Sequence, residues 1–179
     1  AMEMGFSWAG SGQNLAYKKS YFNQIDGFRP VAYEISGDDI YLIQSISRIG
    51  GGSFNPDPSG AVTTLPVDSV WQFINQRIRW ASNSSKQYQS QIWFLVFLLS
   101  VFIVNVSLLL HLVLGVFTLT FLFIWVLKIL MEGIIIYLGS RMSKTPVSYT
   151  IFLLWSIIQI VYIPAMGLLG VAGKFSWKP

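Results

Sequence analysis

A long stretch without any charged side chain dominates the second half of this sequence and restricts its fold. No Asp, Glu, Lys or Arg occurs in residues 92–127, and the apolar run continues to Leu138 with two charged interruptions. As a helix this run would be roughly 70 Å long, about twice the thickness of a bilayer's hydrocarbon core. We therefore predict two membrane spans, at about 92–113 and 116–138, with a break near Gly115.

A second charge-free segment runs from Thr145 to Gly173 and predicts a third span at about 149–171. Pro164 and the glycines after it favour a kinked or re-entrant end, which a bilayer tolerates where neighbouring helices or water satisfy the freed backbone groups. A fully crossing helix and a re-entrant segment therefore both stay open.

Basic residues around the spans predict the orientation of the chain. Arg77, Arg79 and Lys86 precede the first span, and Arg141 with Lys144 lies between the second and third. Two spans return the chain to its starting side, and loops rich in Lys and Arg face the cytoplasm. We expect an integral protein of the cell (inner) membrane whose polar first half is cytoplasmic.

A few polar residues within the spans need separate interpretation. Lys128 and Glu132 are four residues apart on one helical face, so they can form a pair or line a polar path that meets a substrate. His111 is the single histidine and lies among leucines, which favours hydrogen-bonded packing over catalysis. A histidine metal site is excluded, because a lone histidine has no partner ligands.

The composition excludes several classes of protein. Charged residues make up 11% of the chain, against about a quarter in soluble domains, and the formal net charge is +4. The polar half carries no basic stripe with interleaved aromatic residues, so we expect no nucleic-acid partner. There is no cysteine, which removes disulfides, thiolate metal sites and cysteine nucleophiles.

The first half reads as an α/β fragment. We predict short strands and helices, and the helix that opens at Ser36 ends at a run of three glycines. The predicted strands lie at 14–17, 53–55 and 61–65, and the helices at 18–25, 36–49 and 69–85. These elements are too few to close a covered sheet. We expect residues 1–90 to be the C-terminal part of a cytoplasmic domain with a preceding segment outside this sequence, and residues 91–179 to be a transmembrane domain.

The first chemical motif is Ser36-Gly37-Asp38-Asp39, at the start of a predicted helix. Ser36 as N-cap with Asp39 three residues on matches a capping box in which Asp replaces Glu, and carboxylates there suit the helix dipole. Adjacent carboxylates also repel each other, which favours a role as general base. A structural cap and a catalytic base are both consistent with the motif.

The second motif is Gln76-Arg77-Ile78-Arg79-Trp80. On a helix, Gln76, Arg79 and Trp80 share one face. Arg binds phosphate through two parallel hydrogen bonds and Trp offers a flat surface to a sugar ring, which suits a sugar nucleotide. The alternative is an amphipathic helix at the membrane surface with an interfacial Trp/Arg belt.

The third motif is a loop, Gly12-Gln13-Asn14, followed by Ala16 and Lys18-Lys19. Glycines let a backbone approach a ligand closely. The pattern is neither a P-loop nor a dinucleotide fingerprint, so it predicts no nucleotide loop by itself.

In this order and spacing, followed by membrane spans, the three motifs resemble the C-terminal half of membrane-bound family 2 glycosyltransferases with the GT-A fold. That group includes the cellulose, chitin and hyaluronan synthases, and the resemblance covers essentially the whole chain. The G-x-N-x-A-x-K-K loop, the GDD motif and QxxRW carry it.

The resemblance implies a role for each matched residue. Asp39 falls on the family's catalytic base and Asp38 on its acidic neighbour. The family's motif that binds the donor diphosphate and the acceptor end falls on Gln76, Arg79 and Trp80. Its loop near the acceptor pocket falls on Gly12, Gln13 and Asn14. The family's divalent metal (Mg or Mn) is implied as well, but no D-x-D occurs here to hold it. This fragment alone is therefore expected to be inactive.

The resemblance thus implies an inverting hexosyltransferase in the membrane. It would move a sugar from a nucleotide-sugar donor to a lipid-linked or growing polysaccharide acceptor, in biosynthesis of the cell envelope. The alternative from another class is a non-catalytic transporter or channel subunit with a small cytoplasmic domain. The few charges within the spans, and a constellation of catalytic residue types outside them, count against that alternative.

Overall fold

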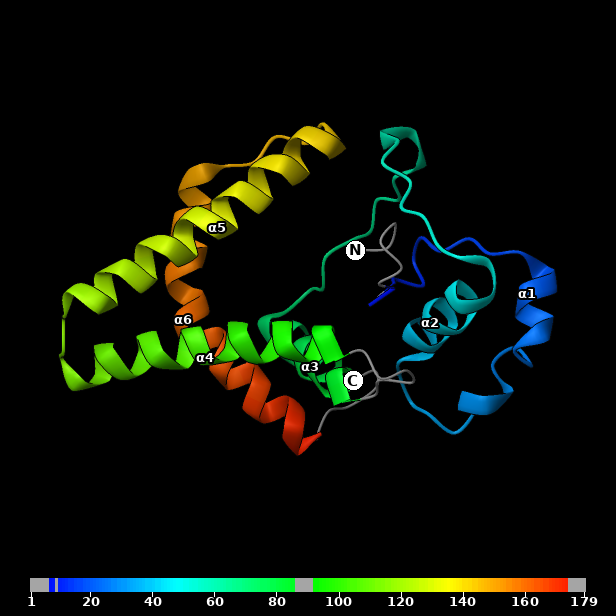
Figure 1. The fold of residues 1–179 in the computed structure, drawn as a ribbon, viewed down its shortest axis with the longest axis horizontal. Helices are drawn as coiled ribbons and strands as arrows, with labels where there is room; N and C mark the ends of the chain where they lie inside the picture. Colours follow the sequence, from blue (N-terminus) through cyan, green and yellow to red (C-terminus); the bar gives the residue numbers. More distant parts are fainter. Residues whose placement is uncertain (1–6, 9, 86–91, 174–179) are drawn as a thin grey trace. The chain divides into compact units, whose positions relative to one another are not determined.

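The computed structural model describes residues 7–8, 10–85 and 92–173, and six α-helices lie in these ranges (Figure 1). They are α1 (Lys19–Gln24), α2 (Asp38–Gly50), α3 (Val70–Ser82), α4 (Ile92–Leu114), α5 (Leu119–Ser143) and α6 (Tyr149–Ala172). Short 3-10 helices occupy Arg29–Val31, Pro58–Gly60 and Asn83–Ser85.

The expected α/β fold is wrong, because the described residues contain no β-strand. Residues 14–17, 53–55 and 61–65 are extended or irregular, and almost all of their side chains are exposed. A strand is stabilised by a neighbouring strand that bonds its backbone and by side chains that one of its faces buries. These segments bury almost nothing, so their β-type composition has no packing to support it.

The chain divides into two compact units. The first comprises Ala1–Asn55, Ser59–Leu95 and Leu169–Pro179, and the second Pro56–Pro58 and Val96–Leu168. In the first unit the buried apolar side chains are those of Val31, Tyr41, Leu42, Ile46 and Ile78. This small core includes residues of both α2 and α3, the helices that carry the acidic and the QxxRW motifs.

Helix α2 begins later than the sequence indicates. Its N-cap is Gly37 and not Ser36, so the expected capping box is wrong. Gly37 has φ +98°, a left-handed conformation that glycine adopts without the steric cost of a side chain. At the other end the helix closes at Gly51, whose N–H donates to Ser47 O over 2.9 Å.

Helix α3 has a local N-cap instead. The Ser69 hydroxyl accepts a hydrogen bond from Gln72 N at 3.2 Å, and Gln72 Oε1 accepts one from Asp68 N at 3.0 Å. This reciprocal arrangement resembles a capping box, S-x-x-Q, and it satisfies amides that would otherwise lack partners at the helix start. The QxxRW motif lies in the second half of this N-capped helix.

Three of the described helices, α4, α5 and α6, are long and apolar enough to cross a membrane by length and composition (Figure 1). The predicted second span, 116–138, differs most from the helix observed. Thr118 Oγ1 accepts a hydrogen bond from Phe121 N at 3.1 Å and starts α5, which continues to Ser143. The apolar run marks the part suited to lipid, whereas the backbone helix extends through the polar residues that follow.

In the second unit these three helices pack together around Leu108, Phe121 and Ile160. Helix α6 runs without interruption from Tyr149 to Ala172 and contains Pro164 within it. His111 packs as expected, since its Nδ1 donates to Ser107 O over 2.8 Å and its ring lies 5.7 Å from that of Phe121.

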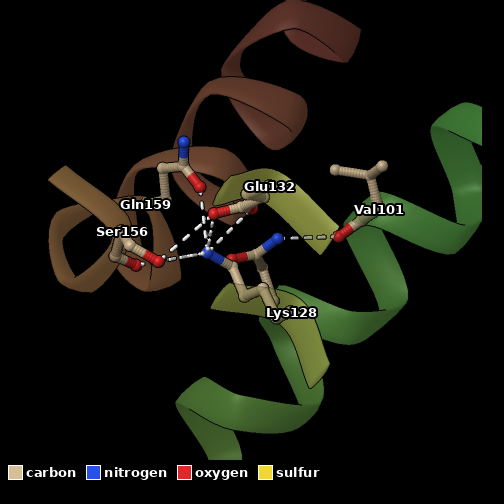
Figure 2. Close-up of polar contacts among 6 residues, drawn as sticks. Val101, Lys128, Glu132, Ser156 and Gln159 are labelled. Carbon is tan, nitrogen blue, oxygen red and sulfur yellow. Dashed lines mark hydrogen bonds and ion pairs between the residues drawn. The ribbon is translucent and has the colours of Figure 1, made fainter. Parts of the chain in front are cut away.

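The charged pair of the second unit joins two helices. Lys128 Nζ lies 2.9 Å from each carboxylate oxygen of Glu132 and also donates to Ser156 and Gln159 of α6 (Figure 2). The Lys128 side chain is 4% exposed, so its charge is neutralised and hydrogen-bonded where it is buried. This geometry favours the interpretation as an inter-helix pair.

Candidate functional site

The acidic motif forms the first turn of α2. The Gly37 carbonyl accepts the first helical hydrogen bond, from Tyr41 N at 3.0 Å, so Asp38 and Asp39 follow directly at the helix start. Asp38 is exposed and Asp39 is half-buried. Both carboxylates therefore lie at the positive end of the helix dipole, where a negative charge is stabilised.

The glycine-containing loop lies against Asp39. Gly12 N donates to Asp39 Oδ2 at 3.3 Å, across 27 residues of sequence, and Ile40 N donates to Oδ1 at 2.9 Å. Backbone N–H groups that bond both oxygens hold the carboxylate in one orientation. The structure thus brings together two of the three motifs, the loop and the acidic pair.

The third motif meets the acidic motif through Ser36. Arg79 Nη1 donates to Ser36 Oγ at 3.2 Å, and Asn83 Nδ2 donates to the same oxygen at 2.8 Å. Ser36 is 3% exposed, so this contact lies inside the first unit. The guanidinium of QxxRW is therefore bonded to the residue that precedes the α2 turn.

Trp80 contacts a different group from Arg79. The guanidinium carbon of Arg77 lies 4.3 Å from the centre of the Trp80 ring and 4.7 Å from that of Phe73, which are cation–π distances. Trp80 is 48% exposed, so much of the indole stays open to a ligand. Arg79 and Trp80 are adjacent in sequence but serve separate contacts.

The remaining site residues from the sequence are less closely gathered. Asn14 directs its amide to Gly60 O at 2.9 Å, so it braces the neighbouring loop. Gln13 is exposed, with its N–H 3.4 Å from Ser11 Oγ, and Gln76 is half-buried on α3. Among the described residues, no hydrogen bond joins these three side chains to Asp39 or Arg79.

A cavity of about 950 Å³ opens beside the glycine loop in the first unit. Gly10 and Ser11, which directly precede that loop, line the cavity together with Asn14 of the loop, and Leu42, Ile43 and Ile46 of α2 line it as well. The mixed apolar and backbone lining is of the kind that ligand sites use. The loop that holds Asp39 is thus also part of a hollow large enough for a small organic molecule.

A metal centre is not supported by the described residues. No group of three or more His, Asp or Glu side chains in the described ranges could hold an ion. The Asp38–Asp39 pair supplies carboxylates from one helix turn only. The described residues therefore do not fit the divalent metal that the resemblance implies.

Sequence reasoning missed three residues at this site, namely Ser36 as an acceptor, Asn83 and Arg77. Asn83 follows Arg79 by four residues and Arg77 follows Phe73 by four, the spacing that places side chains on one helix face. That spacing is a usable signal for helix neighbours. The partner of Asn83 at Ser36, 47 residues away, has no such local signal.

The candidate site thus combines carboxylates at a helix start, a guanidinium bonded to the serine before that helix and an exposed indole. The same chain has three helices that are long and apolar enough to cross a membrane. The sequence model of glycosyl transferase family 21 matches residues 1–178, and the chain belongs to that family. No curated protein and no solved structure matches the chain. The family match covers the loop, the acidic pair, the QxxRW helix and all three apolar helices.

Proposed function

We propose that this chain is part of a membrane-bound, inverting hexosyltransferase that uses a nucleotide-sugar donor and a lipid-linked or growing glycan acceptor. The family match supports glycosyl transfer, and the helices α4, α5 and α6 support membrane association. The order of the motifs, which resembles that of the family 2 synthases, supports the residue roles given below.

Asp39 is the general base in this proposal. Its carboxylate takes the proton of an acceptor hydroxyl as that oxygen attacks the anomeric carbon. The bond from the anomeric carbon to the diphosphate breaks on the opposite side, so the configuration inverts and the nucleoside diphosphate leaves with the bonding electrons. The contacts from Gly12 N and Ile40 N support this role, because they orient the carboxylate. Asp38, exposed beside it, adds negative charge but is not the base.

Arg79 stabilises the departing diphosphate in this proposal. The bond to Ser36 Oγ helps to fix the guanidinium, and a guanidinium binds phosphate oxygens through parallel N–H donors. A positive charge fixed before the reaction stabilises the charge that develops on the leaving group at little reorganisation cost. Arg79 thereby acts on the donor side of the site.

Trp80 and the loop form the acceptor side. The exposed part of the indole stacks on the acceptor sugar, and Arg77 holds the ring in place. Gln76 and the segment Gly12-Gln13-Asn14 border the acceptor pocket. In this proposal the site lies at the cytoplasmic face of the cell membrane, where an acceptor anchored in lipid reaches it.

The observation that carries the proposal is the hydrogen bond between Gly12 N and Asp39, which joins two family-like motifs that are 27 residues apart. The test is transfer of radiolabelled hexose from nucleotide sugars by membranes that contain the intact enzyme. We expect Asp39→Asn to lower the transfer rate by roughly 10²–10⁴-fold, the contribution typical of a general base.

Asp26→Asn is the matched control for that experiment. Asp26 has φ +59°, a conformation that Asn also tolerates, so the same chemical change is made without backbone strain. The control should keep its transfer rate. Near-normal transfer by Asp39→Asn would refute the assignment of the base, and no hexose transfer from any nucleotide sugar would refute the proposed function.

A further inference from the structure

The Ser36 hydroxyl joins two side chains of the QxxRW helix to the acidic motif. Its oxygen accepts hydrogen bonds from Asn83 Nδ2 at 2.8 Å and from Arg79 Nη1 at 3.2 Å. Ser36 and Asn83 are 3% and 5% exposed, so little water competes for these bonds. A hydroxyl has two acceptor lone pairs, and the two donors use them together.

The start of α2 has little local support of its own. Its N-cap is Gly37, which has no side chain to accept from the first amides, and the Asp39 carboxylate accepts from Ile40 N instead. Asp39 lies within that first turn. Contacts made just before the turn therefore add to the Gly12 N–Asp39 contact in fixing its position, and Ser36 is the residue immediately before Gly37.

We infer that Asn83 is a positioning residue that acts through Ser36. By bonding the hydroxyl, Asn83 holds the Gly37 turn that carries Asp39 and also orients the acceptor of the Arg79 guanidinium. The inference rests on the proposed function, because it takes Asp39 and Arg79 to be the base and the donor-side cation. The sequence motif ends at Trp80, so Asn83 extends the site three residues further along the chain.

The geometry explains why an asparagine suits this position. Asn83 is the C-cap of α3 and lies one helical turn after Arg79, so both side chains leave the helix toward Ser36. The Asn83 Oδ1 atom is buried and has no hydrogen-bond partner among the described residues. The amide thus contributes through its donor, and an apolar side chain of similar shape removes that donor without breaking another bond.

Two substitutions test the inference in membranes that contain the intact enzyme. Asn83→Leu removes the donor and Ser36→Ala removes the acceptor. Each should lower kcat by roughly 10- to 100-fold, the cost of a small misplacement of reacting groups, with the KM values for donor and acceptor little changed. Ser36→Thr keeps the hydroxyl and should restore most of the rate.

A double variant shows whether the two residues act as one unit. If Asn83 works through Ser36, then Ser36→Ala combined with Asn83→Leu should be no slower than the slower single variant. Losses that multiply would contradict the inference. Ser69→Ala is the structural control, because it weakens α3 at its capped end, away from Ser36. It should lower thermal stability without lowering kcat at temperatures where the enzyme is folded.

The outcomes also separate this inference from the proposed function. Full kcat in Asn83→Leu and Ser36→Ala, together with an inactive Asp39→Asn, would overturn the positioning role and leave the base assignment standing. Normal transfer by Asp39→Asn would overturn the proposed base whatever Asn83 does. A loss of kcat in Ser69→Ala equal to that in Asn83→Leu would reduce Asn83 to a structural residue.

Discussion

The ammonium of Lys128 lies 2.9 Å from Gln159 Oε1, so a charged side chain on one apolar helix is hydrogen-bonded to another. Ser156 Oγ of the same helix α6 lies 3.1 Å from the ammonium and 3.2 Å from Glu132 Oε2 (Figure 2). The pair is thus enclosed by polar partners of α6. This arrangement aligns α5 with α6, because sliding either helix would leave the ammonium without its acceptors.

Removing Glu132 should lower the stability of the protein more than removing Lys128. Glu132→Leu leaves the buried ammonium without its counter-charge, a change that costs about 3–5 kcal/mol in buried pairs. Lys128→Met leaves a carboxylate that is 26% exposed, so its loss should be smaller. Thermal unfolding of the detergent-solubilised protein measures both. The double variant Lys128→Met with Glu132→Leu should be more stable than Glu132→Leu alone. Equal stability of all three variants would contradict a role for the Lys128–Glu132 pair in aligning α5 with α6.

Asp38 and Asp39 should differ in their effect on turnover. Asp39 receives hydrogen bonds from two backbone amides, whereas Asp38 is exposed at the same helix start. If Asp39 is the base, Asp38→Asn should slow transfer by clearly less than the roughly 10²–10⁴-fold expected for Asp39→Asn. The measurement is kcat for both variants at equal expression. A larger loss in Asp38→Asn would exchange the two roles.

Arg79 should matter for the donor. Arg79→Ala should cut turnover by about 10²–10³-fold, as loss of one electrostatic stabiliser does, and weaken inhibition by the nucleoside diphosphate. Arg79→Lys should rescue only in part, because an ammonium does not reproduce the planar fork of a guanidinium. Inhibition constants for the free diphosphate measure the donor-side effect, and unchanged inhibition in Arg79→Ala would place Arg79 outside the donor site.

Trp80 should matter for the acceptor. Trp80→Ala removes the aromatic face and should raise the acceptor KM by roughly tenfold. Trp80→Phe keeps an aromatic ring and should retain more activity than Trp80→Ala. The donor KM should stay close to that of the natural enzyme. If QxxRW is only an interfacial belt, Arg79→Ala and Trp80→Ala will both lower thermal stability. They will then also impair the use of donor and acceptor to the same extent.

The orientation of the apolar helices can be read by chemical labelling. The sequence has no cysteine, so single introduced cysteines report one position each. Ser143→Cys, at the end of α5, should be protected from an impermeant thiol reagent in intact cells and labelled after permeabilisation. Val116→Cys, in the connection between α4 and α5, should be labelled from outside. The opposite pattern would invert the proposed topology.

Much of the helical content follows from local sequence. The apolar runs predict three long helices, the glycines at 50–52 predict the end of α2, and the helix expected at 69–85 is α3 with the 3-10 turn after it. The expected strands at 14–17, 53–55 and 61–65 are the part that failed. A strand depends on partners elsewhere in the chain, and composition alone does not supply them.

What the sequence determined by itself is therefore the helices, because a helix bonds its backbone within one segment and an apolar run long enough for a bilayer is visible residue by residue. What only the tertiary structure decided is which motifs meet. Gly12 reaches Asp39 across 27 residues, and Asn83 reaches Ser36 across 47. Such contacts depend on the path of the chain between the two residues. Local patterns, which extend over a helical turn or two, carry no information about that path.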